Sequence, residues 1–128
     1  MRRRKNLLYM KCVDGQFVLQ GQPIGSVVDV QILEVNYWLL KWVDGKVVKR
    51  RRLKEGGRWP KGYELSVELI IEYLGRDVVF TVYGRGVTDV LNPYLQQIAL
   101  SGLKVGNLIT RIICWGGSGG NFLEFNQA

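Results

Sequence analysis

The chain has 128 residues, a formal net charge of +7 and two cysteines, and 47% of its residues are hydrophobic. This length predicts one domain, residues 1–128, that can bury a core without disulfides or metals, and the hydrophobic content excludes a disordered chain. The sixteen glycines indicate frequent turns and favour a β-rich domain. Because the chain has no histidine, His-based triads and His metal sites are removed, and we expect no enzyme, no metal and no other cofactor.

Cys12 and Cys114 are the only cysteines. They are too few and too far apart for a zinc ribbon, and two thiols do not make a secreted disulfide framework, so we expect a reducing compartment. The basic start of the chain resembles the first part of a signal peptide, but the apolar segment at residues 7–10 is shorter than the roughly 7 to 15 residues required. No segment has the length to span a bilayer, and we expect no membrane partner.

Residues 6–19 predict a short accessory hairpin. Its turn is the pair Asp14-Gly15, a dipeptide favoured where both central residues take positive φ. With the Arg/Lys run before it, the hairpin gives a basic N-terminal arm over residues 1–25, in which residues 21–25 are interpreted as a connector. The basic run itself is either a solvated tail or a flexible arm on a phosphate backbone.

Residues 26–43 are rich in β-branched and aromatic residues and predict a long strand, bent or bulged. In its second half the two-residue period of a strand places Trp38 and Trp42 on one face and Tyr37 and Lys41 on the other. Paired tryptophans on one strand face bury readily, so we favour Trp38 and Trp42 as core residues. Tyr37 and Lys41 are then candidate contacts, and the reverse arrangement is the alternative.

The stretch 47–61, which follows an Asp44-Gly45 turn, concentrates the positive charge. Residues 41–61 hold nine Lys or Arg and two acids, a local net charge of +7. Such localisation is typical of a footprint for a polyanion, carried either on a strand leaving the body or in a loop. Lys and Arg neutralise phosphates, and an aromatic ring stacks on an unpaired base. The candidate binding residues are Lys49, Arg50, Arg51, Arg52, Lys54, Arg58, Trp59, Lys61, Tyr37 and Lys41.

Residues 64–73 alternate between two faces and predict a strand, although Glu64, Glu68 and Glu72 recur at a helical spacing. We interpret the three glutamates as a solvated outer face rather than as metal ligands or paired catalytic carboxylates. An antiparallel strand follows at 77–83.

Residues 88–102 predict the one helix of the chain. Asn92 is the expected N-cap, Pro93 the first helical position, and Gly102 lies just past the end. The last two predicted strands and the flexible Gly/Ser loop between them are residues 107–115, 121–125 and 116–120.

The resulting order is strand, strand, strand, helix, strand, strand. It predicts a mainly β fold, a five-stranded OB-fold-like barrel with one helix between strands 3 and 4, preceded by the accessory hairpin. In an OB-fold, oligonucleotides bind across strands 2 and 3, between the loops that join strands 1 to 2 and 4 to 5. Here those loops are residues 44–63, with the basic run, and residues 116–120, the glycine loop.

The layout of residues 26–125 supports a family resemblance, together with the segments KRRRLKEGGRWPKGY, ELSVELIIEYL, VVFTVYG, NPYLQQIALSG and NLITRIICW. In these features the chain resembles the OB-fold single-stranded-DNA-binding proteins, especially the compact kind found in phages and mobile elements. Bacterial members end in an acidic tail that recruits replication proteins, whereas this chain ends NFLEFNQA, with one acid. We therefore do not expect recruitment of partner proteins by that route.

The resemblance implies a single-stranded DNA-binding protein of replication or recombination, located in the cytoplasm, or in the host-cell cytoplasm if the protein is viral. Binding would be largely independent of sequence and would use phosphate neutralisation and base stacking. The alternatives are an RNA- or duplex-DNA-binding module and a structural or host-factor-binding β-barrel that binds no nucleic acid. We also expect a homodimer or higher homo-oligomer, because the strand edges at 6–19 and 46–50 need cover.

Overall fold

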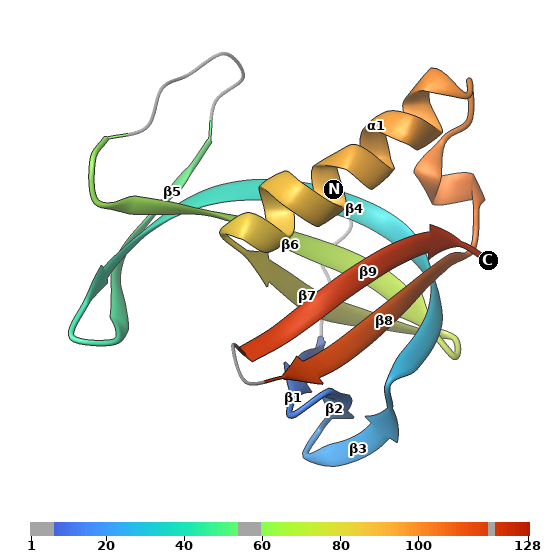
Figure 1. Ribbon diagram of the computed structural model, residues 1–128, viewed down its shortest axis with the longest axis horizontal. Coiled ribbons are helices and arrows are strands. Elements are labelled where there is room, and N and C mark those ends of the chain that lie inside the picture. Colours follow the sequence, from blue (N-terminus) through green and yellow to red (C-terminus); the bar gives the residue numbers. More distant parts are fainter. Residues whose placement is uncertain (1–6, 54–59, 118–119) are drawn as a thin grey trace.

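The computed structural model describes residues 7–53, 60–117 and 120–128. Within them the chain forms a strongly curved, nine-stranded sheet and one α-helix (Figure 1). The elements are β1 Leu8–Val13, β2 Gln16–Leu19, β3 Gln22–Gly25, β4 Val27–Val43, β5 Lys46–Arg52, β6 Tyr63–Tyr73, β7 Arg76–Tyr83, the π-helical segment η1 Gly86–Leu91, α1 Asn92–Leu100, the 3₁₀ turn η2 Val105–Asn107, β8 Thr110–Gly117 and β9 Gly120–Gln127. The mainly β prediction is confirmed, whereas the count of five strands is wrong.

The strand order across the sheet is β3-β2-β1-β7-β6-β4-β8-β9, and β5 pairs with β4 off this path. All neighbours are antiparallel except β1 and β7, which run parallel. The additional strands lie at the N-terminus, where β1, β2 and β3 extend the sheet beyond β7, and beside the second half of β4, where β5 is added.

The N-terminal hairpin is confirmed, with its turn at Asp14 (φ 50°) and Gly15 (φ 77°). The connector expected at residues 21–25 is wrong, because Gln22–Gly25 forms β3. Gln20 and Gly21 take the same pair of positive φ angles, 51° and 77°, so a second tight turn returns the chain along β2. Within the described residues β3 pairs only with β2, and an edge strand tolerates a proline.

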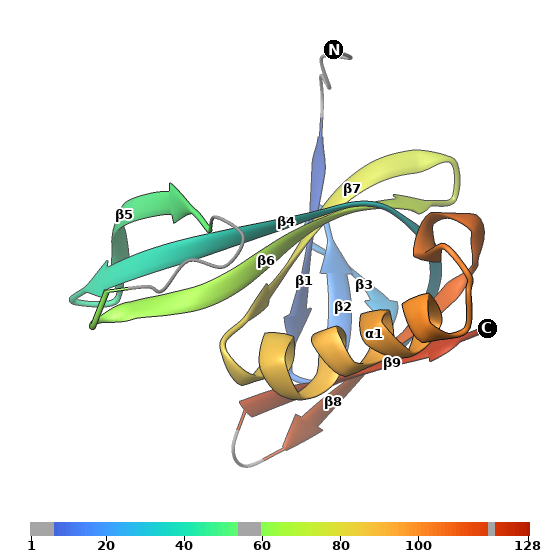
Figure 2. The same ribbon diagram turned by 90° about the horizontal axis from the view of Figure 1, so that it is seen from above.

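β4 runs for 17 residues and carries a bulge between Ile32 and Glu34. The extra residue exchanges the two faces of the strand, so even-numbered residues face the core before the bulge and odd-numbered residues face it afterwards. The strand pairs with three neighbours: its start with β8, its middle and end with β6, and its end also with β5. The hairpin of residues 38–52 and the adjacent start of β6 project from the curved sheet (Figures 1 and 2). We call this projection the arm.

The core lies inside the curve of the sheet. The predicted alternation in β6 is confirmed, because Leu65, Val67, Leu69 and Ile71 are all buried there. Helix α1 contributes Tyr94 and Ile98 to the same apolar cluster. Because this face of β6 packs in the core, the opposite face of β6 is the one left for other contacts.

Asn92 is not the N-cap of α1, because η1 precedes the helix directly. The backbone of Asn92 is helical, with φ −59° and ψ −44°, so its side chain does not cap the segment. Instead its Oδ1 accepts a hydrogen bond of 2.7 Å from the hydroxyl of Tyr37. At the other end, Gly102 follows the helix with φ 76°, which confirms the predicted termination.

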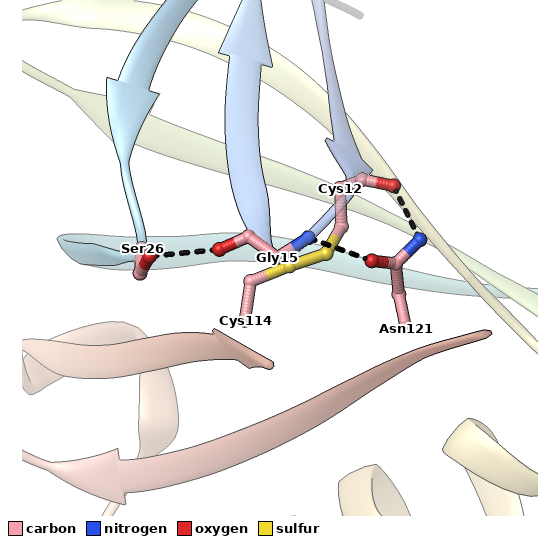
Figure 3. The surroundings of a disulfide bond; sticks show 5 residues. All are labelled: Cys12, Gly15, Ser26, Cys114 and Asn121. Atoms are coloured by element: carbon pink, nitrogen blue, oxygen red, sulfur yellow. Dashed lines mark hydrogen bonds between the residues drawn. A yellow bond between two sulfur atoms is a disulfide. The ribbon is translucent and has the colours of Figure 1, made fainter. Parts of the chain in front are cut away.

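Cys12 of β1 and Cys114 of β8 form a disulfide (Figure 3). Three strands separate β1 from β8 in the sheet, and the curvature brings them together with a Cα–Cα distance of 6.4 Å. The expectation of a reducing compartment treated Cys12 and Cys114 as two thiols, and the structure joins them in a disulfide. In the part of the chain that the structure describes, no helix is long and apolar enough to cross a membrane.

Hydrogen bonds flank the disulfide on both sides (Figure 3). The amide of Asn121, in β9, donates through Nδ2 to the carbonyl of Cys12 (3.1 Å) and accepts at Oδ1 from the backbone N–H of Gly15 (2.9 Å). The hydroxyl of Ser26 donates to the carbonyl of Gly15 (2.7 Å). β1 and the β1–β2 turn are thus held against β8 and β9 by a covalent bond and by the side-chain hydrogen bonds of Asn121.

Candidate nucleic-acid interface

The basic run from Lys46 to Arg52 lies on strand β5, which pairs with the end of β4. Every residue of β5 is exposed. The register places Arg52 opposite Trp38, Arg50 opposite Leu40, Arg51 opposite Leu39 and Lys49 opposite Lys41. Because side chains opposite each other share a face, the cations alternate between two sides of the arm. We call the side of Trp38 and Arg50 the outer face and the side of Leu39 and Arg51 the inner face.

Tyr37 lies on the core side of β4, which contradicts its interpretation as a contact opposite a buried tryptophan face. It is half-buried against the core, and its hydroxyl is bonded to Asn92. Burial raises the pKa of this phenol. The physical reason is the pairing with β6, in which Tyr37 lies opposite Val67 and Leu39 opposite Leu65 on the apolar face of that strand.

Trp38 and Trp42 are consequently on the outer face, so their assignment to the core is wrong. Trp42 is 41% exposed, and its ring centroid lies 6.2 Å from that of Tyr83 at the end of β7. Trp38 is half-buried, but arginines rather than core residues cover its ring. The alternative left open by the strand parity is the correct one.

The remaining candidate residues lie on the inner face, in the turn before β6, or outside the described residues. Lys41, Lys49 and Arg51 are exposed on the inner face, where Arg51 lies 6.0 Å from the centroid of the Tyr63 ring. Lys61 is exposed in the turn before β6. The other three candidates, Lys54, Arg58 and Trp59, lie outside the described residues.

Two arginines of the outer face converge on Trp38. The guanidinium carbon of Arg50 is 4.0 Å from the ring centroid of Trp38, and that of Arg52 is 5.2 Å away. Each guanidinium is held by a second partner: Arg50 Nη2 by Glu68 Oε2 at 2.8 Å and Arg52 Nη2 by Asn36 Oδ1 at 2.7 Å. Glu68 therefore has a basic partner, Arg50 of β5.

Several exposed aromatic residues extend this surface, and they are not among the candidates that the sequence indicated. Tyr9 is 62% exposed, Phe122 57% and Tyr83 49%. Tyr83 was detectable in principle, because the buried Val78, Phe80 and Val82 place it on the opposite face of β7. Tyr9 and Phe122 had no local signal, since their positions depend on how β1 and β9 meet across the curved sheet.

A groove of about 1100 Å³ joins these features. It is lined by residues from the outer face of the arm, from β1, β6 and β7, from η1 and from the start of β9. Its cations and rings include Tyr9, Trp38, Arg50, Tyr83, Arg85 and Phe122. Two acids, Glu68 and Asp89, also line it. The groove thus offers positive charge and flat apolar surfaces to the same ligand.

Among residues 7–53, 60–117 and 120–128, no three His, Cys, Asp or Glu side chains are grouped so that they would hold a metal ion. Comparison with protein-family models, with curated proteins and with solved structures finds no match to the chain. The function is therefore inferred from the geometry of the groove and the arm.

Proposed function

We propose that this protein binds single-stranded DNA in the groove, largely without sequence preference. The observation that carries the proposal is that exposed rings line one groove together with Arg50 and Arg85; the rings are Tyr9, Tyr83 and Phe122. Arginines neutralise phosphates and release condensed counterions, and each base stacked on an aromatic ring adds roughly 1 to 3 kcal/mol. A duplex gains only the first contribution, because its base faces are already stacked on each other.

The arrangement of the strands supports the proposal. We interpret β4, β6, β7, β8 and β9 as strands 1 to 5 of an OB-fold, since they form the contiguous run β7-β6-β4-β8-β9 and α1 follows β7 in the chain. In that fold oligonucleotides bind across strands 2 and 3, which correspond here to β6 and β7. The outer faces of these two strands supply Ser66, Glu68, Thr81 and Tyr83 to the groove. The strands β1, β2, β3 and β5 are additions to this plan.

The proposal is tested by fluorescence anisotropy of end-labelled oligonucleotides of equal length: an oligothymidylate, an RNA of mixed sequence without pairing, and a DNA duplex. We expect the oligothymidylate to bind most tightly, with affinity that falls as salt rises, by about 0.7 in the log–log slope for each phosphate contacted. Equal or tighter binding of RNA or duplex favours that alternative ligand. Absence of binding to all three at low salt contradicts the proposal and favours a structural or protein-binding role.

A pair of variants tests the position of the site. Tyr83→Ala removes an exposed ring from the groove, whereas Trp115→Ala removes a ring of similar exposure, 56%, that does not line it. We expect only Tyr83→Ala to weaken binding of the oligothymidylate, by roughly 1 to 3 kcal/mol. Equal effects of the two substitutions would contradict a specific stacking role of Tyr83.

We also propose that the protein self-associates. The support is the open edge of β5, which among the described strands pairs only with β4, because exposed strand edges favour pairing with another chain. A symmetric dimer is the expected form. Analytical ultracentrifugation tests it, and a single species at the monomer mass of 14.6 kDa at working concentration contradicts it.

A further inference from the structure

The ring of Trp38 is a stacking surface that is covered in the free protein. Arg50 lies over it at 4.0 Å from the centroid and Arg52 at 5.2 Å. A guanidinium plane over an indole face occupies the same space as a stacked base, because both are flat groups attracted to the face of the ring. Trp38 lines the groove together with Arg50 and Glu68.

Arg50, the nearer of the two arginines, is held over the ring by an ion pair, whereas Arg52 is held by a hydrogen bond to Asn36. Arg50 Nη2 lies 2.8 Å from Glu68 Oε2, and the two side chains are 47% and 27% exposed. Ion pairs with this exposure contribute little to stability, since water and salt screen them. A phosphate that enters the groove also forms charge-assisted hydrogen bonds with a guanidinium and therefore competes directly with Glu68 for Arg50.

The indole N–H of Trp38 is a further observation in favour of a rearrangement when a ligand binds. This nitrogen is buried and has no hydrogen-bond acceptor within the described residues. An unpaired buried donor is unfavourable, so a rearrangement that gives the N–H an acceptor on a bound ligand is favoured.

From these contacts we infer that Trp38 is a base-stacking residue of the groove, covered by Arg50 and Arg52 in the free protein, and that Arg50 leaves the ring when a phosphate takes it from Glu68. The inference rests on the proposed function. It assigns Glu68 the role of a positioning residue, which competes with the ligand for Arg50. Phosphate binding and base stacking are then coupled, because the arginine that moves to the phosphate leaves the part of the ring that it covered to the neighbouring base.

The first test uses the protein without ligand. In a full-length variant with Trp42, Trp59 and Trp115 replaced by phenylalanine, Trp38 is the remaining tryptophan of the four. Adding Glu68→Gln should increase quenching of its emission by acrylamide, because Arg50 loses its anchor. The matched control is Glu72→Gln, which removes the same charge from an exposed residue on the same face of β6. Equal quenching in the two variants overturns the assignment of Glu68.

The second test adds labelled oligothymidylate to the same proteins and follows anisotropy and Trp38 emission together. Glu68→Gln should bind more tightly than Glu72→Gln, and Trp38→Ala in the wild-type background should bind about 5- to 150-fold more weakly. Trp38→Phe should weaken binding less, and thermal melting of both variants separates a loss of stacking from a loss of folding. If anisotropy reports binding while Trp38 emission stays constant, this inference fails and the proposed function stands. If no oligonucleotide binds, both fail.

Discussion

Gly15 and Gly116 lie backbone against backbone, where the β1–β2 turn meets β8. A Cβ atom added to Gly15 would lie 2.8 Å from the backbone nitrogen of Gly116, and one added to Gly116 would lie 3.0 Å from the nitrogen of Gly15. Real Cβ atoms hardly ever approach backbone atoms so closely. The two glycines therefore permit the approach of the strands that the neighbouring disulfide then fixes.

Substitution of Gly15 separates this contact from backbone strain. Gly15 and Gly21 both have φ of 77°, but a Cβ on Gly21 would meet no atom within 4 Å. Gly21→Ala should therefore cost about 1 to 2 kcal/mol for the left-handed conformation alone, and Gly15→Ala should cost distinctly more. Urea unfolding of both variants measures the difference, and equal losses would contradict a tight contact at Gly116.

The disulfide should contribute strongly to stability, because it closes a loop with a sequence separation of 102 residues. Replacing Cys12 and Cys114 by alanine should lower the free energy of unfolding by about 2 to 5 kcal/mol. A reductant should destabilise the wild type to the same level and leave the double variant unchanged. Titration of two free thiols in the folded, unreduced protein would show that the bond is absent.

Local patterns in the sequence predicted most of the strands. The alternation of β6, the Asp14-Gly15 and Asp44-Gly45 turns and the end of α1 at Gly102 depend on residues close together in the chain, so periodicity and turn preferences were sufficient. The same holds for the basic run, whose charge is visible without a fold.

The errors concern relationships between distant segments. Strand parity separated Trp38 from Tyr37, but only the pairing with β6 decides that Tyr37 faces the core. The disulfide between Cys12 and Cys114 depends on the curvature of the whole sheet, which no local pattern encodes. For the same reason the groove residues Tyr9 and Phe122, which β1 and β9 bring together, could not be found from local patterns.

Asp29 and Arg111 should give stability a pH dependence at acid pH. They pair across β4 and β8, with Arg111 Nε and Nη2 at 2.9 and 3.1 Å from the two carboxylate oxygens. The hydrogen bond from Arg111 lowers the pKa of Asp29 below its usual value of 3.8. The stabilisation is thus present above the pKa of the unfolded state and is lost as pH falls through the folded pKa.

The measurement is the melting temperature of the wild type and Asp29→Asn between pH 7 and pH 2. The variant should melt slightly lower at pH 7, since both side chains are exposed and the pair is screened. The gap should close as Asp29 protonates below its usual range. A gap that stays constant over the whole range would indicate that the carboxylate charge is not involved.

The basic strand should set the salt dependence of binding. Arg50→Ala, Arg51→Ala and Arg52→Ala combined should weaken binding of an oligothymidylate and reduce the slope of log affinity against log salt by about 0.7 for each phosphate that the variant no longer neutralises. The control removes charge outside the arm, at the exposed Arg76 and Lys104, and should change the slope less. An unchanged slope in the triple variant excludes β5 as a binding surface for the phosphates.

Trp59 remains a predicted stacking residue, and it lies outside the described residues. Its sequence setting, between Arg58 and Pro60 in the basic stretch that the sequence predicts as a binding loop, favours a ring presented to ligand. Trp59→Ala should then cost roughly 1 to 3 kcal/mol in binding a single strand and Trp59→Phe less, because a phenyl ring keeps a face for stacking. Both variants should melt as the wild type does.

If Trp59 instead fills space in the core, alanine leaves a cavity and lowers stability by about 3 to 5 kcal/mol. Melting and anisotropy on the same two proteins decide between these roles: reduced stability with unchanged affinity per folded molecule makes Trp59 structural, and the stacking assignment would then pass to the rings that line the groove.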